Sequence, residues 1–157
     1  RDRLMSRGLG DVYKRHLSGS SIVTVNKEID GFILNRLQGA LLNEAMRLYS
    51  EGYASSEDID ATIKDGLGLR WAFMGPFETI DLNAPGGIKD YMARYGSIFI
   101  EMAKSQTKIP DWSENAGKKL ELERRKVLSE DDLEKRAKKR NFLLKQLRKL
   151  KIENDET

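Results

Sequence analysis

Between Gly31 and Ser50, apolar residues recur every three or four positions. At about 100° per residue they fall on one face of a helix. The residues on this face are Leu34, Leu37, Leu41, Ala45 and Leu48. Asp30 can cap the start of such a helix, and Gly52 can end it. The spacing therefore predicts a helix over about Gly31–Ser50.

Further helices are predicted by start and stop signals along the chain. Ser55 with Asp58 forms a capping pattern, which predicts a short helix closed by Gly66. Pro76 suits the first turn of a helix through about Leu82. Apolar residues at helical spacing predict another helix over about 88–104, and a polar helix is expected after the break at Pro110. The stretch "LGLRWAFMGP" (67–76) is expected to be a loop.

The N-terminal part has a different pattern. Residues 1–20 show no sustained period and end in a Ser/Gly cluster, so we expect a disordered or non-native leader. "SIVTV" (Ser21–Val25) is short and rich in β-branched residues, which predicts a strand. No second convincing strand follows, and a lone strand is not stable. We therefore expect a fragment that begins at the last strand of a missing sheet.

From Ser113 onwards the chain is highly charged, with fourteen Lys or Arg and ten Asp or Glu. A thin apolar stripe remains, formed by Leu133, Ala137, Leu144, Leu147 and Leu150. It predicts an exposed amphipathic helix that docks through this stripe. The run "KRAKKR" (135–140) resembles a nucleic-acid patch, but the surrounding acidic residues favour a solvated helix. We expect a leader (1–20), a helical domain (21–112) and a charged tail that packs on it (113–157).

Composition excludes several classes of protein. The chain has 157 residues and no cysteine, so disulfides, thiolate metal sites and cysteine nucleophiles are excluded. A net charge of +3 is too small to indicate a polyanion partner, and no apolar run is long enough to span a membrane. The only histidine, His16, lies in the leader, so no Ser-His-Asp triad can be assembled with confidence. We expect a cytoplasmic protein without a nucleic-acid or membrane partner.

Asn35 and Arg36 are polar residues within the apolar stretch "GFILNRLQGALLNEA" (31–45). Arg36 falls roughly opposite the apolar face, so we expect it to face water or a carboxylate. Asn35 falls on the rim of that face, one turn before Gly39. Its amide can orient a carbonyl or hydroxyl group. Helix geometry alone favours a structural role, since most buried polar groups are simply satisfied.

The second candidate site is "LRWAFMGPFE" (Leu69–Glu78), in which Arg70, Trp71 and Phe73 precede a Gly-Pro helix start. In one interpretation it lines a substrate site where Arg70 faces a carboxylate. In the other, its aromatic residues simply pack against helices, and both interpretations stay open. "GLGDVY" (8–13) and "GLGLRW" (66–71) imitate a dinucleotide fingerprint but lack the third glycine and the strand–turn–helix context, so we reject both.

The string from Glu28 to Gly87 resembles the C-terminal domain of the L-3-hydroxyacyl-CoA dehydrogenase family. The elements that carry the resemblance are "GFILNR", "EA" followed by "EGYAS", "EDID" and "GLGLRWAFMGPFE". Within the family the chain is most similar to the lambda-crystallin branch, which includes L-gulonate 3-dehydrogenase. A looser similarity extends over about 21–151.

The resemblance implies an all-α multi-helix bundle, similar to the C-terminal domain of 6-phosphogluconate dehydrogenase, with a strand left from a missing Rossmann domain. Full-length relatives would bind NAD in that N-terminal domain, which also carries the catalytic histidine and its glutamate. The helical domain would shape the substrate pocket and form a homodimer. Asn35 corresponds to the Asn that contacts the reacting substrate oxygen, and Arg70 and Trp71 would lie near the substrate.

This chain departs from the family pattern, because it lacks the glycine fingerprint, the catalytic histidine and the paired glutamate. We therefore expect the substrate-binding and dimerisation half of an NAD-dependent dehydrogenase, inactive and without NAD when alone. Its substrate would be a 3-hydroxyacid of the L-gulonate type or a 3-hydroxyacyl-CoA. Arg70 favours the hydroxyacid, because a guanidinium suits a free carboxylate. The alternative is a non-catalytic, crystallin-like structural or interaction protein.

Overall fold

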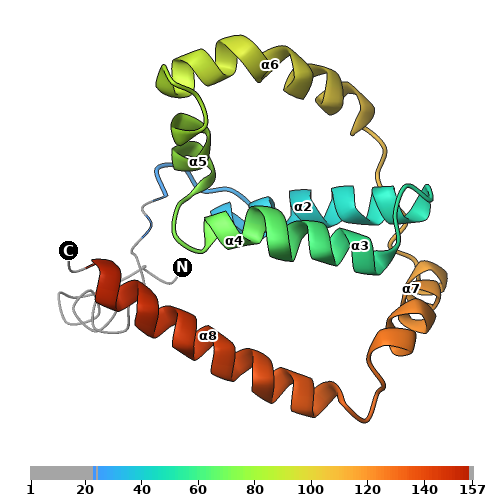
Figure 1. Ribbon diagram of the computed structural model, residues 1–157. Helices are drawn as coiled ribbons and strands as arrows, with labels where there is room; N and C mark the ends of the chain where they lie inside the picture. Colours follow the sequence, from blue (N-terminus) through green and yellow to red (C-terminus); the bar gives the residue numbers. More distant parts are fainter. Residues whose placement is uncertain (1–22, 24, 156–157) are drawn as a thin grey trace, which may run out of the picture. The chain divides into compact units, whose positions relative to one another are not determined.

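The computed structural model describes residue 23 and residues 25–155, and the regular structure in this part of the chain is helical (Figure 1). The predicted all-α class is confirmed. The predicted leader (1–20) lies outside the described residues, as do residues 21, 22 and 24 of the predicted strand. Val23 and Val25, which are described, belong to no strand.

The helices follow one another with short connections. In chain order they are α2 (Phe32–Ser50), α3 (Ser56–Ala61), the π-helix η1 (Thr62–Leu67), α4 (Gly68–Trp71), α5 (Pro76–Leu82), α6 (Gly87–Ser105), α7 (Glu114–Val127) and α8 (Leu133–Asp155). The helices predicted over 31–50, 76–82 and 88–104 are confirmed to within one residue at each end. None of the described helices is both long enough and apolar enough to cross a membrane.

One prediction about local structure was wrong. The chain does not leave the helix at Gly66, because η1 and α4 continue the helical path to Trp71. Gly52 takes a positive φ of 78° after α2, as a helix-ending glycine does, whereas Gly66 has no positive φ. The loop expected over 67–76 is therefore reduced to residues 72–75.

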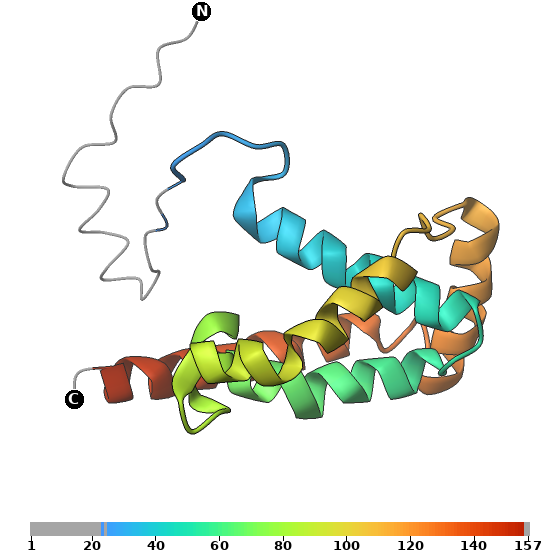
Figure 2. The same cartoon turned by 90° about the horizontal axis from the view of Figure 1, so that it is seen from above.

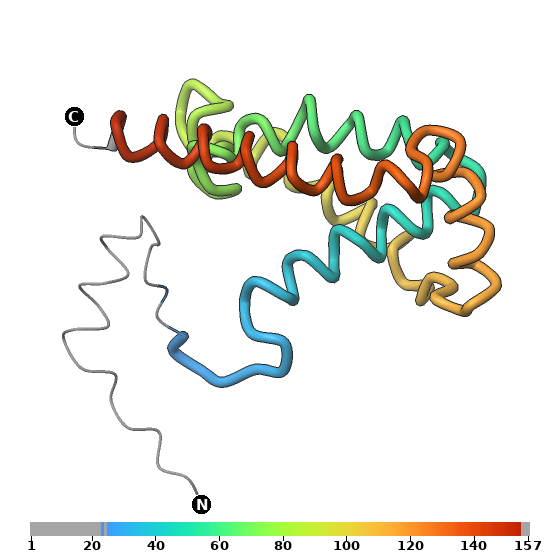
Figure 3. The backbone as a smooth tube through the Cα atoms, turned by 90° about the horizontal axis from the view of Figure 1, so that it is seen from below, coloured from blue at the N-terminus to red at the C-terminus, as the bar shows by residue number. Residues whose placement is uncertain are grey.

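The chain divides into two compact units. The first comprises Arg1–Asn35 and Asp132–Thr157, and the second comprises Arg36–Asp131. In the second unit α5 packs against α6, and α3 packs against α7. Figures 2 and 3 show α7 beside the turn that joins α2 to α3. The buried residues of this unit are Met46, Ser56, Thr79 and Ala84.

Polar contacts tie the segment around α7 to α2 and α3. Trp112 Nε1 donates to Asn43 Oδ1 at 3.0 Å. The backbone N–H and the hydroxyl of Ser56 both donate to Glu123 Oε1 at 2.8 Å. The two bonds from Ser56 hold the pKa of Glu123 below its ordinary value. The start of α3 is thus fastened to α7 by one ionised carboxylate.

We expect this carboxylate to make stability depend on pH. Because the folded-state pKa of Glu123 is lowered, its contribution is present above the ordinary glutamate pKa and is lost as the pH falls through the folded-state value. Urea midpoints should therefore fall more steeply on acidification in the natural chain than in Glu123→Gln. Glu121→Gln, on the same helix but with its side chain exposed, is the matched control. Equal acid sensitivity of Glu123→Gln and the natural chain would contradict this assignment.

In the first unit, α8 carries nine Lys or Arg and three Asp or Glu between residues 133 and 155. Ion pairs along its surface include Lys138–Glu134 at 2.6 Å and Lys149–Glu153 at 3.7 Å. Exposed pairs of this kind contribute little to stability. Leu144 of the apolar stripe is 56% exposed, and docking of α8 through that stripe stays a prediction.

Candidate functional site

Asn35 lies in the first turn of α2, where the chain enters the helix through positive φ angles at Gly31 (81°) and Phe32 (48°). Its side chain is exposed and makes no hydrogen bond to a described residue. Helix geometry favoured a structural role for Asn35, namely a hydrogen bond to another helix or loop. No such hydrogen-bond partner occurs in the described part of the chain. The amide is available to an external acceptor or donor. Arg36 is also exposed, as predicted.

Arg70 and Trp71 form the end of α4. The carbonyl oxygen of Arg70 accepts from the N–H of Phe73 at 3.0 Å and of Met74 at 3.1 Å, which folds residues 72–75 into a tight turn before α5. The guanidinium of Arg70 is exposed and has no ion pair within the described residues, and the Trp71 side chain is 40% exposed. The turn thus follows two neighbouring residues with exposed side chains, a cation without an ion pair among the described residues and an aromatic ring.

The three predicted site residues do not all belong to one unit. Asn35 ends the first segment of the first unit, whereas Arg70 and Trp71 lie in the second. The structure brings Arg70 and Trp71 together as neighbours on one turn, and it describes Asn35 separately. Their union in a single substrate pocket stays a prediction.

A polar cluster on α2 was not identified from the sequence. Arg47 Nε donates to Glu44 Oε2 at 2.9 Å, and Arg47 Nη1 donates to Glu51 Oε2 at 3.1 Å. The bond to Glu44 raises the pKa of Arg47, and the same bond lowers the pKa of Glu44. The ring of Tyr53 lies 5.8 Å from the guanidinium carbon. The sequence signal that could have identified this cluster is the spacing of Arg47 from Glu44 and Glu51, three and four residues, which is typical of ion pairs on a helix.

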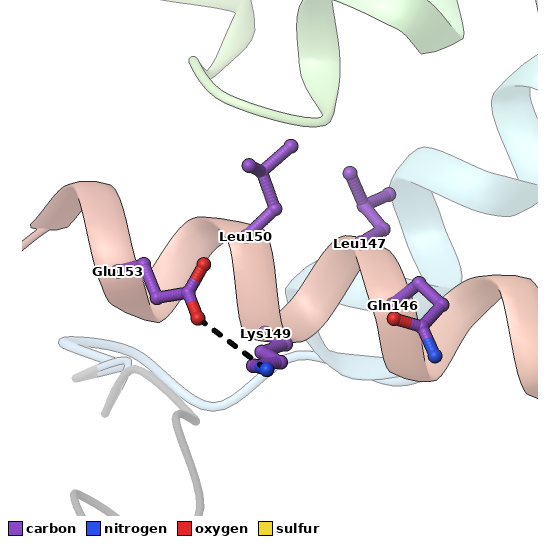
Figure 4. Close-up of a pocket in the computed structure, with 5 residues that line it drawn as sticks. All are labelled: Gln146, Leu147, Lys149, Leu150 and Glu153. Carbon is purple, nitrogen blue, oxygen red and sulfur yellow. Dashed lines mark ion pairs between the residues drawn. The ribbon is translucent and has the colours of Figure 1, made fainter.

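Three surface hollows can be described, and their linings do not include Asn35, Arg70 or Trp71. A hollow of about 340 Å³ adjoins this polar cluster, and its lining is Ala40, Asn43, Glu44, Arg47, Gln106 and Lys108. A smaller hollow of about 220 Å³ lies between α2 and the start of α7. Figure 4 shows the third, an open depression of about 370 Å³ along α8, where Leu147 and Leu150 project to one side and Lys149 pairs with Glu153. Ligand sites bury most of their ligand, which a depression on one helix cannot do.

Two kinds of cofactor site can be checked among the described residues, a metal site and a dinucleotide fingerprint. They contain no group of three His, Cys, Asp or Glu that could hold a metal ion. They also contain no strand, whereas a dinucleotide fingerprint needs a glycine-rich turn between a strand and a helix. The exposed polar groups at the predicted site residues are the amide of Asn35 in the first unit and the guanidinium of Arg70 in the second.

The chain belongs to the 3-hydroxyacyl-CoA dehydrogenase family, because the family model "3-hydroxyacyl-CoA dehydrogenase, C-terminal domain" matches residues 31–130. The matched range includes Asn35, Arg70 and Trp71.

Individual relatives agree with this assignment. Lambda-crystallin of Oryctolagus cuniculus is 44% identical over 135 residues, which cover 85% of this chain and 42% of the relative. The lambda-crystallin homolog of Rattus norvegicus is 41% identical over 131 residues, covering 82% of this chain and 41% of the relative. L-carnitine dehydrogenase of Streptomyces coelicolor is 43% identical over 81 residues, covering 51% of this chain and 26% of the relative. The chain thus spans about two fifths of the length of the lambda-crystallins that it matches.

Proposed function

We propose that this chain is the substrate-binding and dimerisation part of an NAD-dependent dehydrogenase that oxidises a 3-hydroxyacid of the L-gulonate type or a 3-hydroxyacyl-CoA. The observation that carries the proposal is the match to the C-terminal domain of a dehydrogenase family over residues 31–130. In this proposal Asn35 hydrogen-bonds the reacting oxygen of the substrate. Arg70 binds a carboxylate, and Trp71 supplies an apolar wall beside it.

Hydride transfer requires NAD, which we assign to the Rossmann domain that precedes the helical domain in full-length relatives. When bound to that domain, NAD would supply the hydride acceptor for oxidation of the carbinol carbon of the substrate. The described residues of this chain do not form a cradle for NAD, so their part is to bind and orient the substrate. The catalytic histidine and its glutamate also belong to that preceding domain.

NAD binding can be measured on this chain alone. Isothermal titration calorimetry of the chain with NAD should give no binding heat above dilution, because no strand–turn–helix cradle is present among its described residues. Attaching this chain, from Ser21 onwards, to the part of rabbit lambda-crystallin that precedes the matched region should restore NAD binding. We call this fusion the joined enzyme. Saturable NAD binding by the chain alone would overturn the assignment of NAD to the domain that precedes the helical domain in full-length relatives.

The proposed homodimer rests on exposed apolar side chains of the long helices. On α6 the large exposed apolar residues are Ile88, Met92, Tyr95, Ile98, Phe99, Ile100 and Met102. Phe99 is 51% exposed, and its ring lies 6.2 Å from the ring of Tyr91 on the same helix. Homodimer interfaces are more apolar than other interfaces, and an apolar surface of this extent favours burial against a second copy.

The dimer prediction can be tested by sedimentation velocity. The natural chain should be a dimer at micromolar concentration, and Phe99→Glu should be a monomer because a buried unpaired carboxylate is costly at an apolar interface. Glu101→Lys changes a charge on the same helix at a side chain that is 70% exposed, and it should leave the dimer intact. A natural chain that is monomeric at this concentration would remove dimerisation from the proposal.

The second candidate function is a non-catalytic, crystallin-like structural or interaction protein. Relatives named lambda-crystallin or lambda-crystallin homolog favour it, including those of rabbit and rat. This alternative requires no substrate response. If the joined enzyme bound NAD yet oxidised neither hydroxyacids nor hydroxyacyl-CoA thioesters, the structural role would be favoured.

A further inference from the structure

The helical path from Ser56 to Trp71 changes its hydrogen-bond pattern in the middle. Residues Thr62–Leu67 form a π-helix, and the N–H of Gly68 donates to the carbonyl oxygen of Ile63, five residues earlier. A π-turn holds one residue more than an α-turn, so the helix that follows lags by about one residue, or about 100° around the axis. π-Turns are rare and frequently occur at functional sites.

This lag decides which way Arg70 points. In an uninterrupted α-helix, Arg70 would fall within about 20° of Ile63, on the face of the half-buried Ile59 and Ile63. The π-turn moves Arg70 to about 120° from that face and brings Trp71 towards it. Arg70 is exposed and Ala72 is half-buried, as the shifted register requires, while Trp71 keeps 40% exposure on the side to which the turn brings it.

Gly68 is the residue that permits the turn. A Cβ atom at this position would lie 2.9 Å from the backbone oxygen of Ile63, and a backbone oxygen cannot move aside as the end of a side chain can. At Gly66, two residues earlier, a Cβ atom would meet nothing within 4 Å. The two glycines of "GLG" therefore differ, and Gly68 is the one that the π-turn requires.

We propose that the π-turn and Gly68 are positioning elements, which turn Arg70 away from the packed face so that its guanidinium is free to bind a substrate carboxylate. The proposal rests on the proposed role of Arg70 in substrate binding. It adds a residue, Gly68, and a local conformation that determine specificity without touching the substrate.

Thiol labelling tests the register in this chain, which has no cysteine of its own. With a neutral disulfide reagent, Arg70→Cys should react at least tenfold faster than Ala72→Cys. An uninterrupted α-helix would reverse this order, because position 72 would then lie opposite the packed face. Slower labelling at position 70 than at position 72 would overturn the proposal.

A second set of variants tests Gly68. Added to Arg70→Cys, Gly68→Ala should slow labelling severalfold because the methyl group opens the π-turn, whereas Gly66→Ala should not. Deleting Lys64 from the Gly68→Ala variant should restore fast labelling. Position 68 is then four residues after Ile63, so their hydrogen bond fits an ordinary α-helix, and in that helix position 70 still points outward. Circular dichroism checks that each variant retains its helices. Equal labelling rates for Gly68→Ala and Gly66→Ala would overturn the assignment of Gly68.

Kinetics separates this proposal from the proposed function itself. In the joined enzyme, Gly68→Ala should raise KM for a hydroxyacid about tenfold with little change in kcat, and it should add nothing in an Arg70→Met background. A labelling shift without a change in KM would remove the substrate role of Arg70 while leaving the register intact. A change in KM that persists in the Arg70→Met background would overturn positioning through Arg70.

Discussion

Replacing Asn35 with alanine in the joined enzyme is expected to lower kcat by about 10²–10³, the usual effect of removing one donor to a reacting oxygen. The amide of Asn35 is exposed and makes no hydrogen bond to a described residue, so Asn35→Ala breaks no contact seen in the fold. Because the interaction strengthens as charge develops on the oxygen, the loss should appear in kcat more than in KM. Steady-state kinetics over a range of hydroxyacid concentrations, from below KM to saturation, measures both constants.

Two further variants make this result specific. Asn35→Asp keeps the size of the side chain but removes the donor and adds a charge, so it should be at least as inactive as Asn35→Ala. Arg36→Ala, one position along the helix and also exposed, should retain nearly full kcat and serves as the control. If Asn35→Ala retained full kcat, Asn35 would have no part in the chemistry.

Much of the helical pattern could be predicted because its signals are local. Pro76 after a glycine set the start of α5, and the predicted range 76–82 is the observed one. Gly52 adopts the positive φ that its position after α2 indicated. Such features depend on a few neighbouring residues, and a sequence displays those directly.

The π-turn could not be predicted in the same way. Gly66 carries the usual signal of a helix end, but the chain continues past it, because the N–H of Gly68 finds an acceptor in Ile63. Helical wheels assume a constant angle per residue, so a wheel drawn through this region assigns Arg70 to the wrong face. The error arises at the segment to which we assign substrate recognition.

Contacts between residues far apart in the sequence also could not be predicted from the pattern of hydrophobic and polar residues. Asn43 falls on the polar side of α2, and its oxygen accepts from Trp112, 69 residues away. Glu123 likewise belongs to a helix that was predicted only as polar, yet it binds the start of α3. Periodicity gives the face of a residue but does not name the segment that covers this face. Asn35, Arg70 and Trp71 could be singled out from the sequence as candidates, but only the family resemblance favoured a substrate role for them over a structural one.

Arg70→Met in the joined enzyme is expected to raise KM for a hydroxyacid anion by roughly 10–100-fold, since hydrogen bonds to a charged group contribute about 1.5–3 kcal/mol. The guanidinium has no ion pair within the described residues, so it is free to make two parallel bonds to a carboxylate. Arg70→Lys keeps the charge but cannot form this fork, so it should recover only part of the loss. Arg94→Met, which removes an exposed arginine already paired with Asp90, is the matched control.

The same variant distinguishes between the two substrate classes. A 3-hydroxyacyl thioester has no free carboxylate next to the reacting part of the molecule, so its kcat/KM should change little in Arg70→Met if Arg70 serves hydroxyacids. Equal losses with both substrates would mean that Arg70 shapes the pocket rather than recognising charge. If kcat/KM fell only for the thioester, Arg70 would bind the phosphates of CoA, because a guanidinium also binds phosphate bidentately. The acyl-CoA would then be the substrate.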